Sequence, residues 1–369
     1  LAKGARMQGV KIIEDTIVTG ISLNKSTEHG PSRVGAVKTA KGEILCEKIV
    51  NCTGQWANIL GEMVGVNIPL ASVEHQYLIT EPIEGVTKDL PTLRDPDNLT
   101  YWKEDIGGLV MGGYEPNPIP WAEKGIPQDF IFQLLPENFE HFEQLMLSAL
   151  ERVPALENAG IRKFINGPES FTPDGNFILG EAPEVKNYFV GAGFNAFGIA
   201  AAGGAGKALA EWIMAGEPPM DLWVVDIRRF SDIHRDKNWV KNRTLELYGK
   251  HYTLSWPHEE HESGRPYLTS PIYEKLQKQG ACFGSKLGWE RPNWFAPKGI
   301  EPCDIYSYGR QNWFKFVGEE HRAVRERVAI FDQSSFAKFR IIGSDSEKAL
   351  SRICANHVAK PPGTLTYTQ

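Results

Sequence analysis

The order of apolar and polar positions at the start of the chain predicts a strand followed by a β-hairpin. Val10–Glu14 and Thr16–Ile21 are rich in β-branched residues, which favour strands. An alternating segment then runs from Val34 through Lys41-Gly42 into Ile44–Val50, and this period of two indicates half-buried strands. We expect the hairpin to turn at Lys41-Gly42.

A strand, a turn of small residues and a helix are predicted next. The run Ile49-Val50 continues into Asn51-Cys52-Thr53-Gly54-Gln55-Trp56, and an amphipathic helix is expected over Ala57–Val64. A strand, turn and helix of this kind let the backbone approach a ligand closely.

The middle of the chain alternates short strand patterns with one long helical pattern. The helix is expected from Glu137 to Val153. We interpret the strands as a sheet that receives a substrate; they are predicted at His75–Thr80, Leu99–Lys103 and Leu109–Gly113.

A buried strand and a glycine-containing helix are predicted after this sheet. The strand is Asn187–Gly191, and the helix is Gly198–Met214 with glycines at 203, 204 and 206. Each glycine inside a helix costs roughly 1 kcal/mol relative to alanine. Something therefore requires a close approach to this backbone, and a packed sheet and a ligand are both open explanations.

The last part of the chain divides into a weakly periodic stretch and a new pattern. Residues 230–302 are polar and aromatic, and we interpret them as a connecting module rather than a catalytic core. A domain boundary is placed near residue 300. A helix and two strands are predicted beyond it, at Glu320–Val328, Ala329–Asp332 and Lys338–Ile342.

Composition narrows the class of protein. The chain has 369 residues, more than the roughly 100–200 of one domain, so two or more units are expected. With 41% hydrophobic residues, 23% charged residues and a net charge of −6, it has no basic surplus for nucleic acid. It also lacks an apolar run of the roughly 18 residues that a membrane helix needs.

The cysteines and aromatic residues narrow the class of protein less than the overall composition does. The 5 cysteines are scattered and form no C-x-x-C pair, so we predict neither a disulfide frame nor a metal site. The 10 Trp, 11 Tyr and 18 Phe suit an enclosed ligand chamber and packed cores equally.

No complete nucleotide-binding fingerprint is present. Gly191-Ala192-Gly193 lacks the third glycine of G-x-G-x-x-G, and Gly204–Ala208 lacks the spacing of a P-loop. The segment from Gly191 to Gly204 nevertheless joins a strand, a glycine-rich loop and a helix N-terminus. Backbone N–H groups near Phe197–Ile199 would therefore attract negative charge on a ligand.

Four motifs in order along the chain carry a resemblance to a known family. Two later segments, Gly288–Phe295 and Gln333–Phe339, agree with it. The motifs are Val50–Ala57 (VNCTGQWA), Glu74–Thr80 (EHQYLIT), Asn166–Asp174 (NGPESFTPD) and the glycine-rich segment at 191–204. On these residues the chain resembles, over its whole length, the dimethylglycine and sarcosine dehydrogenase family of flavin enzymes.

The resemblance implies a mixed α/β and α+β architecture in three parts. Residues 1–230 would be the C-terminal part of a D-amino-acid-oxidase-like, FAD-dependent oxidoreductase domain with its substrate-binding sheet. Residues 231–300 would be its central domain, and residues 301–369 the start of an aminomethyltransferase-like, folate-binding domain. The family's ADP-binding glycines and flavin-attaching histidine would precede Leu1, and most folate contacts would follow Gln369. We therefore expect the fragment alone to be inactive.

The resemblance also implies a reaction, which is oxidative demethylation of dimethylglycine or sarcosine by hydride transfer to FAD. The one-carbon unit would pass to tetrahydrofolate, and electrons would leave through an electron-transferring flavoprotein or oxygen. Substrate choice stays open, because Arg310–Phe314 and Arg327–Ala329 are closer to dimethylglycine dehydrogenase whereas Gly167–Asp174 is closer to sarcosine dehydrogenase. The expected compartment is the mitochondrial matrix in a eukaryote and the cytoplasm in a bacterium.

By the same resemblance, the catalytic pair would be His75 and Tyr101. A histidine of ordinary pKa near 6.5 can hold the amine proton, and a tyrosine hydroxyl can tune it. His75 is alternatively a strand histidine with satisfied hydrogen bonds, and Tyr101 a packing residue. Trp102 is the rival if the alignment slips by one position.

Positions similar to the family's flavin contacts form a second group. Trp56 is alternatively a core residue. The Phe197–Ile199 amides would stabilise the negative charge of reduced flavin. The predicted FAD-binding residues are Val18, Thr53, Gly54, Trp56, Gly193, Phe194, Asn195, Phe197, Gly198 and Ile199.

Two other functions remain open. The regulatory subunit of pyruvate dehydrogenase phosphatase shares this architecture and an equivalent of His75, so a non-catalytic regulatory protein is the main alternative. Folate-dependent aminomethyl transfer alone is a third hypothesis, and it ranks last because barely 70 residues of that domain are present.

Overall fold

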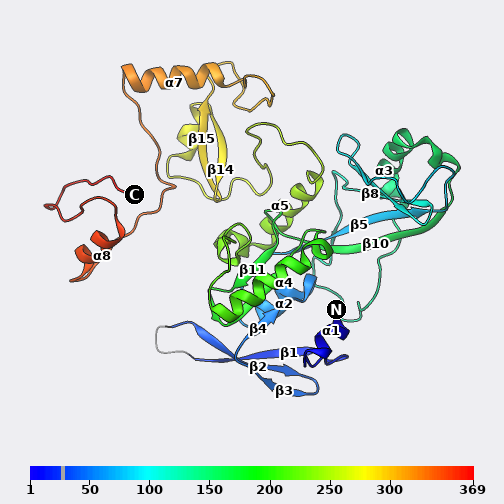
Figure 1. The fold of residues 1–369 in the computed structure, drawn as a ribbon. Helices are drawn as coiled ribbons and strands as arrows, with labels where there is room; N and C mark the ends of the chain where they lie inside the picture. Colours follow the sequence, from blue (N-terminus) through cyan, green and yellow to red (C-terminus); the bar gives the residue numbers. More distant parts are fainter. Residues whose placement is uncertain (26–29) are drawn as a thin grey trace. The chain divides into compact units, whose positions relative to one another are not determined.

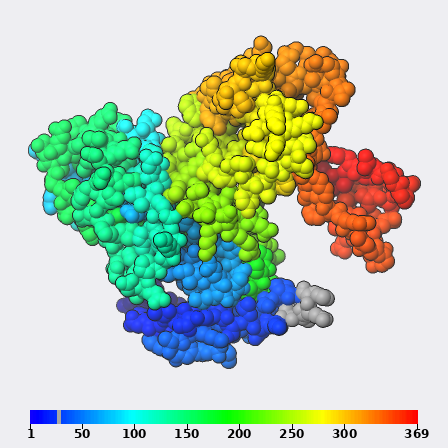
Figure 2. Space-filling model, turned by 180° about the vertical axis from the view of Figure 1, so that it is seen from behind, coloured from blue at the N-terminus to red at the C-terminus, as the bar shows by residue number. Residues whose placement is uncertain are grey.

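The computed structural model describes residues 1–25 and 30–369. The chain forms two compact units, which we describe separately: Leu1–Tyr267 with Ile305–Asn312, and Leu268–Asp304 with Trp313–Gln369. In the first unit, a six-stranded sheet and its helix gather in one lobe, coloured cyan to teal in Figure 2.

A four-stranded sheet follows the short helix α1 (Ala2–Met7). The predicted hairpin is confirmed, since Thr39 pairs with Gly42 at its turn. The prediction of a strand at Val10–Glu14 is wrong, because this exposed segment has no ladder partner among the described residues. The strands are β1 (Val18–Asn24), β2 (Ser32–Thr39), β3 (Gly42–Leu45) and β12 (Val185–Lys186).

A three-stranded sheet carries the predicted strand–turn–helix. Strand β4 (Ile49–Asn51) pairs in parallel with β13 (Tyr188–Ala192), which pairs with β11 (Ile178–Glu181). After β4 come a 3-10 turn, Gly54–Trp56, and helix α2 (Ala57–Glu62). Helix α4 (Gly198–Ala215) buries Leu209 and Trp212 against Leu179 and Phe189 of this sheet.

The six-stranded sheet is antiparallel and has two different faces (Figure 1). One face packs Leu78, Trp102 and Met111 against Phe142 and Leu145 of helix α3 (Phe139–Arg152). The other face carries the candidate site. In spatial order the strands are β10 (Ile161–Phe171), β5 (Ala71–Thr80), β8 (Gly108–Gly113), β7 (Thr100–Asp105) and β6 (Leu93–Asp95), with β9 (Pro120–Trp121) pairing with β5.

The region interpreted as a connecting module contains a regular helix, α5 (Lys237–Gly249). Asp236 caps its N-terminus by accepting hydrogen bonds from the backbone N–H groups of Asn238 and Trp239. Three 3-10 turns complete this unit, at Pro154–Asn158, Ile227–Arg229 and Asp232–Arg235.

The second unit is built on one hairpin. Trp294 is buried there with Cys282 and packs against Phe316. The strands predicted at Ala329–Asp332 and Lys338–Ile342 are wrong, because both segments are exposed and pair with no strand among the described residues. The elements are α6 (Tyr273–Lys278), β14 (Ala281–Lys286), β15 (Trp289–Phe295), α7 (Phe314–Glu326) and α8 (Ser346–Ile353).

Candidate active site

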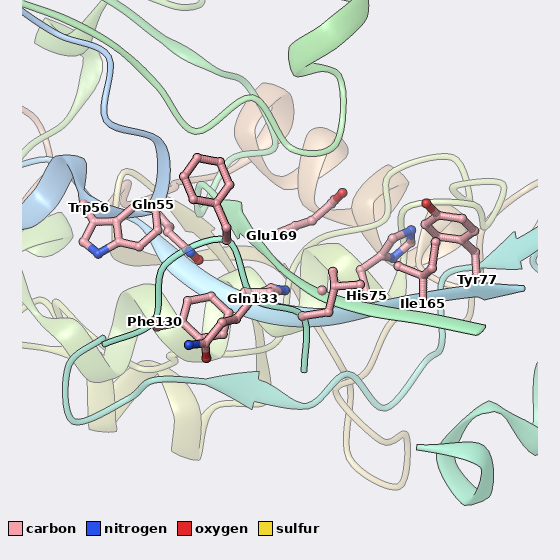
Figure 3. Close-up of a pocket in the computed structure, with 12 residues that line it drawn as sticks. Gln55, Trp56, His75, Tyr77, Phe130, Gln133, Ile165 and Glu169 are labelled. Carbon is pink, nitrogen blue, oxygen red and sulfur yellow. The ribbon is translucent and has the colours of Figure 1, made fainter. Parts of the chain in front are cut away.

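A cavity of about 330 Å³ lies on the face of the six-stranded sheet opposite α3. Figure 3 shows His75 and Tyr77 side by side at one end and Trp56 at the other. Its wall joins β5, β10, the turn after β4 and the segment before α3: Gln55, Trp56, His75, Tyr77, Phe130, Phe132, Gln133, Leu134, Ile165, Gly167, Pro168 and Glu169.

Strand register explains why these side chains share one wall. Directly opposed residues of an antiparallel pair point to the same face. His75 pairs with Gly167, and Tyr77 pairs with Ile165. Gly167 has no side chain, so it leaves space in front of His75.

Tyr101 reaches His75 because a glycine lies between their strands. Gly112 pairs with Tyr77 on one side and with Tyr101 on the other. A Cβ on Gly112 would lie 2.5 Å from Cζ of Tyr101, so only glycine lets the ring lie across β8. The Tyr101 hydroxyl is 3.4 Å from Nε2 of His75.

The rival position, Trp102, faces the other way. It is 3% exposed in the core beneath α3, and its Nε1 donates to Oγ1 of Thr100 at 3.3 Å. The structure therefore brings Tyr101, and not Trp102, to His75.

Behind His75 lie two further polar residues. Nδ1 of His75 is 2.8 Å from the hydroxyl of Tyr248 on α5, and that hydroxyl donates to Oε2 of Glu115 at 2.8 Å. Tyr248 and Glu115 are each 1% exposed. Residues 230–302, interpreted from the sequence as a connecting module, thus contribute α5 to the surroundings of His75.

Burial sets the charge state of the site. It lowers the pKa of His75 to about 4, with His251 adding to the effect, so His75 is neutral near pH 7. Burial, with Tyr114 and Glu169 nearby, raises the pKa of Tyr101 well above its ordinary value. The site therefore presents a neutral imidazole and a neutral phenol.

Glu169 is the acidic side chain among the described residues of the cavity wall. Burial raises the pKa of its carboxyl to about 7, and Oε2 has no hydrogen-bond partner among the described residues. A buried carboxylate without a partner favours an incoming cation. By contrast, Asp174 is held by an ion pair with Arg229 at 2.6 Å.

The predicted flavin contacts divide into buried supports and exposed positions. Asn195 is 2% exposed; its Oδ1 accepts from Thr172 N at 2.8 Å and its Nδ2 donates to Gly193 O at 2.8 Å. Gly193 has a φ of +63° and lies against Leu70 and Thr172. These two residues shape the loop from inside, and Phe194 stacks on Phe177.

The other predicted flavin contacts include exposed positions. Trp56 is 37% exposed at the cavity wall, Phe197 is 52% exposed and Ile199 is 100% exposed. No side chain caps α4 at Phe197, so its first backbone N–H groups are available to an anionic group such as the reduced flavin ring. Thr53 and the exposed Gly54 adjoin Trp56, whereas Val18 lies in the four-stranded sheet and not in the cavity wall.

The three glycines in the interior of α4 face open space. A Cβ at Gly203, Gly204 or Gly206 would meet no other segment of the described chain within 4 Å. A packed sheet is therefore not the reason for these glycines in this structure, and a ligand stays the remaining prediction.

Sequence reasoning missed Glu115 and Tyr248, and it left Glu169 out of the catalytic group. For Tyr248 a signal was available, because Val240, Thr244 and Tyr248 recur every four residues after a capping Asp236 and are buried together. Nothing local marks Glu115, whose role depends on a partner 133 residues away.

Neither a membrane-spanning helix nor a metal-binding cluster occurs among the residues that the structure describes. No helix there is long and apolar enough to cross a membrane. No cluster of three His, Cys, Asp or Glu side chains there is suited to holding a metal ion.

The antiparallel sheet with its buried histidine, and the strand, glycine-rich loop and uncapped N-terminus of α4, all lie within a part of the chain that one family model covers. Residues 1–212 match the FAD dependent oxidoreductase family, and the chain belongs to it. Residues 215–270 match the FAD dependent oxidoreductase central domain, and residues 272–369 the GCVT N-terminal domain. These matches confirm the mixed fold class; the boundaries after residues 230 and 300 stay predictions.

Among curated proteins, the resemblance to dimethylglycine and sarcosine dehydrogenases is confirmed. Mitochondrial sarcosine dehydrogenase of Homo sapiens is 39% identical over 100% of this chain and 42% of its own length. The formaldehyde-forming 4-methylaminobutanoate oxidase of Paenarthrobacter nicotinovorans is 41% identical over 94% of this chain and 41% of its own. The chain thus spans about two fifths of the length of these relatives.

Two further similarities complete the comparison. The mitochondrial pyruvate dehydrogenase phosphatase regulatory subunit of Mus musculus is 38% identical over 100% of this chain and 42% of its own length. Among solved structures, L-proline dehydrogenase from P. horikoshii has a TM-score of 0.52 and 28% identity, covering 62% of this chain and 57% of its own.

Proposed function

We propose that the parent protein oxidatively demethylates small N-methylated amino acids with FAD. The observation that carries the proposal is a neutral His75 beside Tyr101 in an aromatic cavity that also holds Glu169. The amine relatives support the same class of substrate.

The cavity suits the amine end of such a substrate. None of the described residues in its wall is Lys or Arg, and Glu169 is its single acidic group. A methylated ammonium would meet this carboxylate and the faces of Trp56 and Phe130, which attract cations. The cavity therefore selects a cationic amine over an anion.

Proton handling falls to His75 and Tyr101. The carbon next to nitrogen gives up hydride most readily when the amine is neutral, so the ammonium proton must leave first. Nε2 of His75 is an acceptor within reach of the cavity, and the Tyr101 hydroxyl next to it supplies a hydrogen bond. FAD, when bound, supplies the acceptor for the hydride.

Trp56, Phe197 and the first amides of α4 would hold the flavin ring, supported from inside by Asn195. The other residues predicted as flavin contacts are proposed for the same role.

The GCVT N-terminal domain is consistent with transfer of the one-carbon unit to tetrahydrofolate. Electrons would leave through an electron-transferring flavoprotein or oxygen. The fragment of residues 1–369 would be inactive without the rest of the parent.

Sarcosine and dimethylglycine are the proposed substrates. 4-Methylaminobutanoate should be tested with them, because one relative is named as an oxidase of that compound. By analogy with the mitochondrial relatives, the compartment would be the matrix in a eukaryote. In a bacterium it would be the cytoplasm.

The regulatory alternative keeps one observation in its favour, which is the 38% identity to the phosphatase regulatory subunit. It predicts a parent that folds but is not reduced by amines. The enzymatic and the regulatory hypothesis both include this cavity, so a redox measurement is needed to distinguish them.

The test is a flavin spectrum of the full-length parent, followed by anaerobic titration with the three amines. Bleaching of the oxidised flavin band by at least one of them is expected. A parent without flavin, or with a flavin that none of them reduces, would refute the proposal and favour the regulatory reading.

A further inference from the structure

A line of hydrogen bonds leads from the cavity into the protein interior. His75 contacts the cavity, its Nδ1 is 2.8 Å from the Tyr248 hydroxyl, and that hydroxyl is 2.8 Å from Oε2 of Glu115. Glu115 does not line the cavity. It can therefore act on a substrate only through Tyr248 and His75.

The direction of these bonds follows from counting protons. The Tyr248 hydroxyl has one proton and stands between two groups. If Glu115 is a carboxylate, it only accepts, so Tyr248 donates to Glu115 and its oxygen must accept from Nδ1–H of His75. Neutral His75 then carries its proton on Nδ1, and Nε2 is left as a bare acceptor.

We propose that Glu115 is a positioning residue that, through Tyr248, fixes His75 in the tautomer whose Nε2 accepts a proton from the substrate amine. The proposal rests on the proposed function only for the identity of that amine. The tautomer itself is a property of the folded protein.

Packing around the end of α5 holds the hydrogen-bonded residues in place. Gly249, the last residue of α5, lies so close to Pro116 that a Cβ would sit 2.7 Å from the Pro116 carbonyl oxygen. This contact brings Tyr248 next to Glu115. The Tyr248 ring packs between Tyr114 and Phe171, at centroid distances of 5.1 Å in both cases.

The charge of Glu115 is adjustable near neutral pH. Burial raises the pKa of Glu115 to about 7; the hydrogen bond from Tyr248 opposes the rise, and Glu74 on β5 adds to it. A proton on Glu115 turns it into a donor toward Tyr248, which would then donate to Nδ1. The His75 proton would move to Nε2, and the acceptor would be lost while the imidazole stays neutral.

Other groups near His75 do not replace this control. Tyr101 on β7, Tyr114 just after β8 and Tyr248 on α5 face its ring, and burial raises the pKa of each above its ordinary value. His251 also faces the cluster, and burial lowers its pKa. Glu169 on β10 also has a pKa of about 7, but its Oε2 has no hydrogen-bond partner among the described residues. Glu115 is therefore the group within this line of hydrogen bonds that titrates near neutral pH.

The test is solid-state ¹⁵N NMR of the full-length parent labelled at histidine, with His75 assigned by difference against His75→Gln. At pH 8.5 we expect the bare-Nε2 tautomer to exceed the other by about tenfold or more, the ratio that one charge-assisted hydrogen bond supplies. Glu115→Leu and Tyr248→Phe should each bring the Nε2–H form to at least a comparable population. Wild type at pH 5.5 should shift the same way.

The control is Tyr252→Phe, which removes a hydroxyl from the same aromatic cluster without touching His75. It should leave the tautomer unchanged. A bare Nδ1 in wild type at pH 8.5, or one tautomer shared by wild type and both relay variants, would overturn the proposal. Because no substrate is used, a correct tautomer in a parent that amines do not reduce would refute the proposed function alone.

Discussion

The replacement Gly112→Ala tests the geometry that brings Tyr101 to His75. The new Cβ would lie 2.5 Å from Cζ of Tyr101 and 2.9 Å from Cβ of Tyr77, with the Tyr101 hydroxyl oxygen closer still. Unstrained contacts need 3.4 Å or more, so the ring has to move by roughly an ångström. The 3.4 Å contact between the hydroxyl and Nε2 would be lost with it.

The expected cost has two parts. Overpacking a well-packed site typically destabilises a protein by about 1–3 kcal/mol, which chemical denaturation of the chain would detect. A misplacement of about 1 Å at a catalytic group can cost about a hundredfold in rate. We therefore expect flavin reduction in the full-length variant to slow by roughly ten- to a hundredfold.

Two comparisons isolate the Tyr101 ring as the cause. In a Tyr101→Ala background, Gly112→Ala should cost at least about 1 kcal/mol less, the scale of coupling between residues in contact. Gly204→Ala, which meets open space, should stabilise the chain by up to about 1 kcal/mol through helix propensity. If Gly112→Ala is as stable as wild type, or costs the same with and without the ring, the reasoning is refuted.

Two more variants probe the cavity and its supporting loop. Glu169→Gln removes a carboxyl whose folded pKa of about 7 lies above its unfolded value, so wild type loses this group's stability as pH rises from about 4.5 through 7. The difference in the free energy of unfolding, variant minus wild type, should therefore rise between pH 5 and pH 8, by up to roughly 1.4 kcal/mol per pKa unit; a flat or falling difference would contradict the assignment. Asn195→Ala leaves Thr172 N and Gly193 O without their partner and should lower the free energy of unfolding by about 1–3 kcal/mol per unpaired group. Asn195→Asp, which keeps the acceptor for Thr172 N, should lose less, and equal losses for both would show that this bond is unimportant.

Local patterns predicted those parts of the fold that local forces determine. The hairpin at Thr39–Gly42, the strands around His75 and Tyr101, and helix α4 all follow the apolar periodicity of their own residues. Val10–Glu14 and Ala329–Asp332 have similar β-rich composition, yet they form no strand because a strand also needs a partner. Periodicity carries no information about that partner.

Part of the candidate site could be predicted from the sequence, and part depended on tertiary packing. The family resemblance predicted His75 and Tyr101, which lie 26 residues apart on two strands of one sheet with β8 between them. Tyr248 lies 173 residues from His75 and reaches it through the packing of α5 against Pro116, Tyr114 and Phe171. Such a contact depends on tertiary packing, so it could be found only in the structure.

The central claim is that His75 and Tyr101 assist amine oxidation by a bound flavin. The most direct measurement is the anaerobic single-turnover rate of flavin reduction in the full-length parent, for wild type, His75→Gln and Tyr101→Phe, with His234→Gln as a control on a separate 3-10 turn. We predict a loss on the order of tenfold or more for each of the first two variants, the scale of lost acid–base assistance, and an unchanged rate for the control. Reduction rates that are the same in all four proteins would contradict the account.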